Sequence, residues 1–272
     1  MISNTNFLPD VQDVAHSFSQ AAKNYDQVAG LQRLVADQLI TKGAGLHQGR
    51  VLDIGSGTGY VSAKLANLEA VTKVTGLDIA QGMIDYAQSC HHNSKLNWQL
   101  GDAQQIPLAL PGHGSTYDLV TSSLAIQWCK NLDAVFSGVA HCLTEDGFFH
   151  CATLGPQTLH QLKWAWGQVD NYQHVNEFVP LEVLRKALKN HFVEVSVECR
   201  PIELKYKSVQ QLTKDLKQLG ASNHNAYAAQ GLMGVGRLRK MVQAYESLRD
   251  EKGQLPVTYE VYYIKAKTKV VV

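Results

Sequence analysis

VLDIGSGTGY, residues 51–60, and GLDIA, residues 76–80, decide the fold of this chain. The first stretch is typical of a buried strand that runs into a glycine-rich turn and then a helix, and the second of a strand that ends on a carboxylate. Glycines let the backbone approach a ligand that a Cβ would obstruct. The two stretches predict a nucleoside-cofactor site at the carboxyl ends of parallel strands, where Asp78 can accept hydrogen bonds from both ribose hydroxyls.

The spacing of the glycines distinguishes between cofactors. A dinucleotide fingerprint needs a third glycine at the position of Tyr60, and a phosphate-binding P-loop needs a Lys-Ser or Lys-Thr pair, which does not follow here. Instead Asp53 stands two residues before Gly55, and Asp78 follows at the end of the next strand. This pattern resembles the first motif of class I S-adenosylmethionine-dependent methyltransferases. The resemblance implies S-adenosylmethionine as the cofactor.

Length, composition and charge restrict the kinds of protein that this chain can be. The chain has 272 residues, 45% of them hydrophobic and 18% charged, which suits one large core, or one core and a small cap. A net charge of +1 gives no overall attraction to nucleic acid or to a membrane. The chain shows no basic start followed by an apolar run, no C-x-x-C pair and no metal-ligand spacing among its histidines. We therefore expect a cytoplasmic protein with free thiols and without a signal peptide, membrane span or metal.

Strands alternate with helices, which predicts an α/β fold with a mostly parallel sheet. The resemblance to class I methyltransferases implies the Rossmann-like fold of that class, with seven strands and helices on both faces. The expected strands are 50–54, 73–78, 96–100, 117–122, 147–154, 192–198 and 256–266. We expect a single domain over residues 1–272, with an N-terminal helical segment at 10–40, a cofactor-binding core at 50–154, helical cap insertions over the carboxyl edge at 155–190 and 205–250, and the last strand at 256–266. Lys265, Lys267 and Lys269 alternate along that strand, and we interpret them as protection of an exposed sheet edge.

Several residues around the glycine turn are candidates for cofactor binding. Asp78-x-x-Gln81 is also close to a capping box, but the glycine turn one strand earlier favours ribose binding. Asp102 can accept from the adenine amino group or close an Asx turn. Asp53 is expected to hold the turn by accepting from backbone N–H groups. The full set is Asp53, Gly55, Ser56, Gly57, Gly59, Asp78, Ile79, Met83, Asp102, Ala103, Ser123 and Leu124.

Segments outside the glycine turn carry a more specific resemblance. They are 17–22, 25–26, 31–32, 123–129, 153–155, 166–170, 174–180, 216–221 and 256–259. They resemble the malonyl-[acyl-carrier protein] O-methyltransferases of biotin synthesis over nearly the whole chain. The resemblance implies methyl transfer to the free carboxylate of a malonyl thioester, borne by an acidic acyl-carrier protein or by coenzyme A, to give the methyl ester that starts pimeloyl and biotin synthesis.

The acceptor pocket is expected to contain Tyr25, Gln127, Trp128, His174 and Asn176. For each of them singly, burial in the core is the alternative. A malonyl carboxylate has a pKa of roughly 4 and is ionised at neutral pH, so no general base is needed. Which side chain holds this carboxylate is left open.

Two features depart from the family pattern. Glu177 stands where the family usually has Arg, and residues 222–231 lack a basic residue that we expect after Asn225. Candidates for a carrier-protein surface are Arg237, Arg239, Lys240, Lys205 and Lys207, with a solvated helix face as the alternative. Two other functions are weighed against the main one: a small-molecule O- or C-methyltransferase on the same fold, and a non-catalytic cofactor-binding assembly protein.

Overall fold

The computed structural model describes residues 10–106, 116–219 and 235–268. Within them a seven-stranded sheet has the order β3-β2-β1-β4-β5-β7-β6. The strands are β1 (Gly49–Ile54), β2 (Val71–Asp78), β3 (Leu96–Leu100), β4 (Tyr117–Ser123), β5 (Leu143–Leu154), β6 (Phe192–Tyr206) and β7 (Leu255–Thr268). β7 is antiparallel to β5 and β6, while the other pairs are parallel. The predicted mostly parallel α/β sheet is confirmed.

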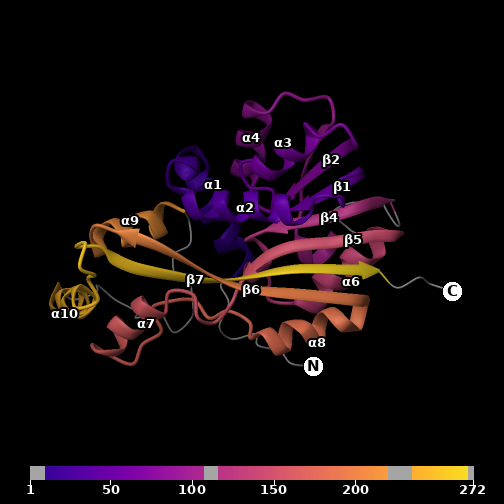
Figure 1. Ribbon diagram of the computed structural model, residues 1–272. Coiled ribbons are helices and arrows are strands. Elements are labelled where there is room, and N and C mark those ends of the chain that lie inside the picture. Colours follow the sequence, from indigo (N-terminus) through magenta and orange to yellow (C-terminus); the bar gives the residue numbers. More distant parts are fainter. Residues whose placement is uncertain (1–9, 107–115, 220–234, 269–272) are drawn as a thin grey trace.

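Helices cover both faces of the sheet (Figure 1). They are α1 (Val11–Val28), α2 (Gly30–Lys42), α3 (Tyr60–Ala66), α4 (Gln81–Cys90), α6 (Leu132–Cys142), α7 (His160–Gly167), α8 (Leu181–His191), α9 (Val209–Gln218) and α10 (Val235–Glu246), with short 3-10 turns η1 (Ala103–Gln105) and η2 (Ile126–Trp128). Adjacent residues of β1 show the two faces: Val51 is in a cluster with Ala36 and Val61, and Leu52 in a cluster with Phe136. This alternation follows from the period-2 geometry of a strand.

The N-terminal helical segment breaks at Ala29, so that α1 and α2 are separate helices. α1 packs against α4 on one side and against α9 on the other. It therefore lies between the cofactor-binding core and the helices at the carboxyl edge. Thr58 Oγ1 in the glycine turn donates to Asp26 Oδ1 of α1 at 2.9 Å, which ties the helix to the turn.

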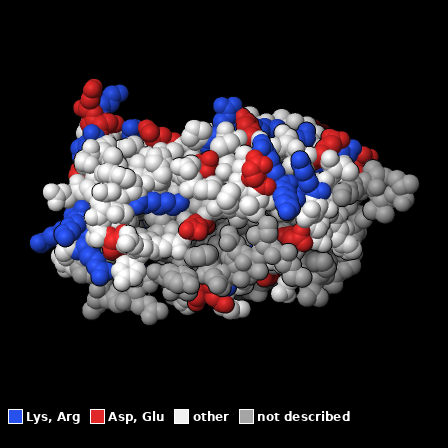
Figure 2. All heavy atoms as spheres, turned by 90° about the horizontal axis from the view of Figure 1, so that it is seen from below, with Lys and Arg blue, Asp and Glu red and all other residues white. Residues whose placement is uncertain are grey.

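α7, α9 and α10 lie at the carboxyl edge, beside the extended ends of β6 and β7 (Figure 1). A second hydrophobic cluster joins them: it contains Trp166 of α7, Leu212 of α9 and Met241 of α10 together with Val257 of β7. α8, which belongs to the expected insertion at 155–190, packs instead beside α6 over β6. Basic side chains gather at the left end of the molecule in Figure 2, the end at which Figure 1 shows α10.

The interpretation of the C-terminal lysines as edge protection is wrong for the two that the structure describes. β7 lies between β5 and β6, so it is an interior strand. Lys265 Nζ lies 5.0 Å from the centre of the Phe148 ring, and Lys267 pairs with Asp146 at 3.1 Å. Lys269 and the segment 222–231 lie outside the described residues. None of the helices within the described ranges is long and apolar enough to span a bilayer.

Candidate active site

The glycine turn begins at the carboxyl end of β1, next to β4, where the strand order reverses. Gly55, Gly57 and Gly59 have φ angles of +68°, +54° and +86°. A Cβ on Gly55 would come within 2.1 Å of the Ala125 Cβ, whereas a Cβ on Gly57 would meet nothing within 4 Å. Gly55 therefore permits close packing of two loops, and Gly57 leaves open space at the turn. Such a crevice is where open α/β sheets bind ligands.

Asp78 ends β2 and faces this turn. Its Oδ2 accepts from the Gly57 N–H and its Oδ1 from the Ala80 N–H, both at 2.8 Å. Burial raises the pKa of the Asp78 carboxyl, and the backbone N–H groups around it oppose that shift. Gln81 donates to Asp85 rather than back toward Asp78, so the alternative of a capping box is not formed.

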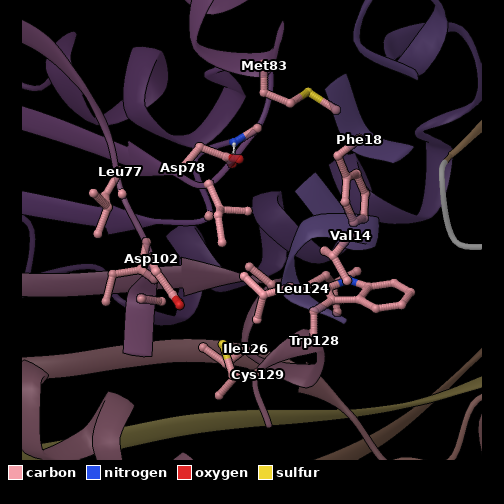
Figure 3. A pocket seen from close by; sticks show the side chains of 18 of the residues that line it. Val14, Phe18, Leu77, Asp78, Met83, Asp102, Leu124, Ile126, Trp128 and Cys129 are labelled. Atoms are coloured by element: carbon pink, nitrogen blue, oxygen red, sulfur yellow. Dashed lines mark hydrogen bonds between the residues drawn. The ribbon is translucent and has the colours of Figure 1, made fainter. Parts of the chain in front are cut away.

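A first cavity opens over the carboxyl ends of β1, β2 and β4 (Figure 3). It is lined by most of the residues predicted to bind the cofactor: Gly55, Gly57, Asp78, Ile79, Met83, Asp102, Ala103, Ser123 and Leu124. Asp102 also accepts from the Gln104 N–H at 2.8 Å, so it closes an Asx turn while it lines the cavity. In Figure 3 the carboxylates of Asp78 and Asp102 lie on one side, and Val14, Phe18 and Trp128 on the other.

Three of the predicted cofactor residues lie outside the lining of this cavity. Asp53 is 1% exposed and accepts from the Ser62 hydroxyl at 2.6 Å and from the Ser62 N–H. Its hydrogen bonds thus hold the first turns of α3 rather than the glycine turn itself. Burial raises the pKa of Asp53 to about 7. Gly59 is the N-cap of α3, and Ser56 has a buried hydroxyl with no partner.

A second cavity lies under α7 and α9, and it brings together all five predicted acceptor residues: Tyr25, Gln127, Trp128, His174 and Asn176. Phe18, Tyr25, Leu124 and Trp128 line both cavities. The rings of Phe18 and Trp128 meet edge to face, with centroids 5.6 Å apart. The two cavities therefore meet at a wall of three aromatic side chains and one leucine.

Gln127 holds the backbone at this wall. Leu124 has a φ of +51°, which is strained for a residue with a Cβ. The Gln127 side chain donates to the Leu124 carbonyl at 2.7 Å and accepts from the Thr153 hydroxyl at 3.2 Å. Both ends of the Gln127 amide are thus engaged inside the protein. Leu159, which also lines the second cavity, has a positive φ as well, of +57°.

His174 is fixed by two neighbours. Its ring stacks on Trp166 at 3.7 Å between centroids, and its Nε2 lies 2.7 Å from Asp170 Oδ1. The Asp170 carboxyl has a lowered pKa because His174, the Tyr172 N–H and Arg237 stabilise its charge against the effect of burial. Burial, with the charges of Asp78 and Asp26, raises the pKa of Tyr25 far above its ordinary value.

Apart from Tyr25, sequence reasoning missed what α1 and α2 contribute to these cavities. Val11 and Val14 line the first cavity, and Gln32 lines the second. The apolar spacing of residues 10–40 indicated a buried face but not what that face covers. Glu177, the departure from the family pattern, is exposed and interacts with Lys163, so its negative charge has a basic neighbour.

Comparison with known proteins agrees with this geometry. Residues 52–151 match the family described as a methyltransferase domain. The crystal structure of YcgJ protein from Bacillus subtilis superimposes with a TM-score of 0.59 at 14% identity, over 82% of this chain and 92% of that one. The sheet order and the position of the crevice define the class I methyltransferase fold.

Two relatives narrow the assignment. The chain is 36% identical to the malonyl-[acyl-carrier protein] O-methyltransferase of Gallionella capsiferriformans, over 94% of this chain and 90% of the relative. It is 44% identical to the biotin biosynthesis bifunctional protein BioHC of Cellvibrio japonicus, over 94% of this chain and 50% of that protein, so it spans half the length of this relative. The chain belongs to the malonyl-[acyl-carrier protein] O-methyltransferase family.

Proposed function

We propose that this chain transfers a methyl group from S-adenosylmethionine to the free carboxylate of malonyl-[acyl-carrier protein], and that the resulting methyl ester enters pimeloyl and biotin synthesis. The observation that carries the proposal is a likeness of 36% identity that extends over 94% of the chain and so includes the helices of the second cavity. A likeness limited to the glycine turn would support only a methyltransferase of unknown acceptor.

The first cavity fits the nucleoside part of S-adenosylmethionine. The Asp78 carboxylate accepts from the Gly57 and Ala80 N–H groups and is also stabilised by that of Ile79, and since a carboxylate has about four acceptor positions, it can still accept from a ribose hydroxyl. Ile79 and Met83 provide apolar surface for the adenine, and Asp102 an acceptor for its amino group. The open space at Gly57 allows the backbone to approach the ligand.

Methyl transfer to a carboxylate requires the protein mainly to position the acceptor oxygen against the methyl donor. The acceptor carboxylate is already ionised at neutral pH, since its pKa is roughly 4. Tyr25 stays protonated because its pKa is raised, so it acts as a hydrogen-bond donor and not as a base. Burial raises the pKa of Cys129 to about 12, so this thiol at the first cavity does not compete as a nucleophile. Alignment of the oxygen with the methyl–sulfur bond can contribute on the order of 7–11 kcal/mol.

The acidic carrier protein is proposed to approach the end of the molecule that carries α10. Of the candidate basic residues, Lys205 is paired with Glu203 and Asp250, and Arg237 lies 3.7 Å from Asp170. Arg239 and Lys240 are exposed on α10. They are the better candidates because their charge is available to a partner.

The test is incubation of the protein with S-adenosylmethionine and malonyl-[acyl-carrier protein], followed by mass spectrometry of the carrier. We expect one added methyl group, and a rate that is nearly constant between about pH 6 and 8 because the nucleophile does not titrate there. A rate that rises steeply with pH would indicate a phenol or amine acceptor. Cofactor binding without methylation of the malonyl thioester would support an assembly protein instead.

A further inference from the structure

The second cavity is lined by two carboxamides whose buried oxygens have no partner. Asn176 is 7% exposed, and its Oδ1 makes no hydrogen bond. The Oε1 of Gln32, on α2, is likewise buried and unpartnered. A buried polar group without a partner loses the free energy of its hydration, so native proteins keep few of them without a reason. Two such groups in one cavity indicate that a bound ligand supplies their missing hydrogen-bond partners.

Three other polar side chains of this cavity, those of Gln127, Thr158 and His174, are already engaged. Gln127 bonds to the Leu124 carbonyl and Thr153, and Thr158 Oγ1 donates to the Glu260 carbonyl at 3.3 Å. His174 is held by Asp170. Among the described residues that line the cavity, the only Lys or Arg is Lys217, and it is exposed. Hydrogen bonds from side-chain amides to an acceptor therefore fall to Gln32 and Asn176, beside the Tyr25 hydroxyl on the wall shared with the first cavity.

Neutral donors suit methyl transfer to a carboxylate. The oxygen loses its negative charge as the bond to the methyl carbon forms, while the sulfonium loses its positive charge. A fixed cation beside the carboxylate would stabilise the charged ground state more than the transition state and would slow the step. An amide NH₂ holds the oxygen with a weaker bond, which loses less strength than an ion pair does as the charge on the oxygen falls. Rotation of the amide by 180° exchanges its oxygen and nitrogen, so each side chain can offer either.

We propose that Gln32 and Asn176 are specificity-determining residues that hold the acyl end of the acceptor, by donating to the carboxylate oxygen that does not attack and to the thioester carbonyl. This inference rests on the proposed function. The acceptor it describes is a short dicarboxylic acyl group in which the carboxylate and the thioester carbonyl are both attached to the same methylene carbon. The attacking oxygen would lie at the wall shared with the first cavity, near Tyr25 and Trp128.

The test is steady-state methylation of a malonyl thioester by Asn176→Asp and Gln32→Glu, with calorimetric titration of S-adenosylmethionine on each variant. Both changes keep the size of the side chain but place a carboxylate against the anion. We expect KM for the malonyl thioester to rise about tenfold or more in each variant, and the cofactor dissociation constant to stay within about twofold. Binding of the uncharged methyl ester product should weaken less than binding of the malonyl thioester.

Gln161→Glu is the matched control. Gln161 is as buried as Asn176, at 7% exposure, but it is bonded to Thr258 and does not line the cavity. Its variant should lower the melting temperature and leave KM for the malonyl thioester unchanged. An unchanged KM in both test variants would overturn this inference and leave the proposed function intact. Equal weakening of cofactor, substrate and product would reveal a structural role and also overturn it. An unaltered protein that methylates no malonyl thioester would overturn both.

Discussion

Asp78 has a structural task and a proposed binding task at one position. It joins the glycine turn to the end of β2 through the N–H groups of Gly57 and Ala80, and it presents its remaining lone pairs to the first cavity. We expect Asp78→Ala to weaken the binding of S-adenosylmethionine by ~1–3 kcal/mol, measured by isothermal titration calorimetry. Asp85→Ala is the control: Asp85 is exposed on α4 and accepts from Gln81, and it does not line the first cavity, so its variant should leave affinity unchanged. Equal affinities in both variants would remove Asp78 from the site.

Asp53 illustrates how a buried carboxyl makes stability depend on pH. Its pKa is raised to about 7 in the folded protein, chiefly by burial, and is ~3.9 in an unfolded chain. Between these values the folded state holds a proton that the unfolded chain has lost. The stability that this group contributes is therefore present below about pH 4 and is lost as pH rises through about 7.

We therefore expect Asp53→Asn to flatten the pH profile of stability. In the unaltered protein this one group lowers the free energy of unfolding by up to ~1.4 kcal/mol per pH unit across the window, and asparagine removes that slope while it can still accept from Ser62. Thermal melts without cofactor between about pH 4 and 8 measure it. Asp85→Asn should keep the original slope, and an Asp53→Asn profile as steep as the original contradicts the expectation.

At the scale of elements, α1 decides whether the two cavities meet. It carries Phe18 and Tyr25 into both cavities, and it is held against α4 by a close approach at Gly82. The Gly82 N–H donates to the Ser19 hydroxyl at 3.2 Å, and a Cβ on Gly82 would lie 2.6 Å from the Ser19 carbonyl oxygen. Because that neighbour is backbone, the two helices must separate to accommodate any side chain.

We expect Gly82→Ala to weaken both cofactor and acceptor binding, since the displaced α1 opens both cavities. The change should be several-fold in the cofactor dissociation constant and in KM for the malonyl thioester. Gly30→Ala is the control: a Cβ there meets nothing within 4 Å, so the variant should bind normally and melt at the same or a higher temperature. If Gly82→Ala binds both ligands as tightly as Gly30→Ala, the packing of α1 on α4 does not control the site.

The elements that local patterns specify could be predicted from the sequence. β3 was expected at 96–100 and is found there, and the glycine turn follows β1 as expected. β6 extends to Tyr206, well past the expected end at 198, because Pro201 interrupts the apparent strand pattern. Pro201 is tolerated there since β6 is an edge strand of the sheet, where the missing N–H is not needed for pairing. The same period-2 pattern cannot distinguish an interior strand from an edge, which is why Lys265 was misinterpreted.

The second cavity was harder to predict because its walls come from distant parts of the chain. The resemblance to a family indicated Tyr25, Trp128 and His174 as neighbours, and the structure brings them to one cavity. The resemblance included residues 31–32 but indicated no site role for Gln32, and a glutamine on an amphipathic helix is ordinarily at the surface. Its Oε1 is nevertheless buried and unpartnered in the folded protein, where the neighbouring Leu31 joins the cluster that contains Trp166 of α7.

At the scale of the whole molecule, the distribution of charge matters more than its sum. The net charge is only +1, yet Arg237, Arg239 and Lys240 lie together on α10, which packs on α7 and α9 around the second cavity. Lys217, on α9, is exposed while it lines the same cavity. A negatively charged carrier would therefore be attracted to the end of the molecule at which its acyl group has to enter. Attraction of this kind acts on encounter and is screened by salt.

We accordingly expect the double variant Arg239→Glu/Lys240→Glu to raise KM for malonyl-[acyl-carrier protein] about tenfold at low ionic strength, and to change KM for malonyl-pantetheine little, because the small thioester carries no acidic protein surface. The difference should shrink as salt approaches about 0.5 M, since the Debye length then falls to a few ångströms.

Lys186→Glu/Lys189→Glu, an equal charge change on the exposed side of α8, is the control and should leave both KM values close to the original. Steady-state kinetics with the two thioesters at several salt concentrations decides the matter. If the α10 variant affects both substrates equally, or the α8 variant affects the carrier protein as strongly, the carrier docks elsewhere and the α10 side chains form an ordinary solvated helix face.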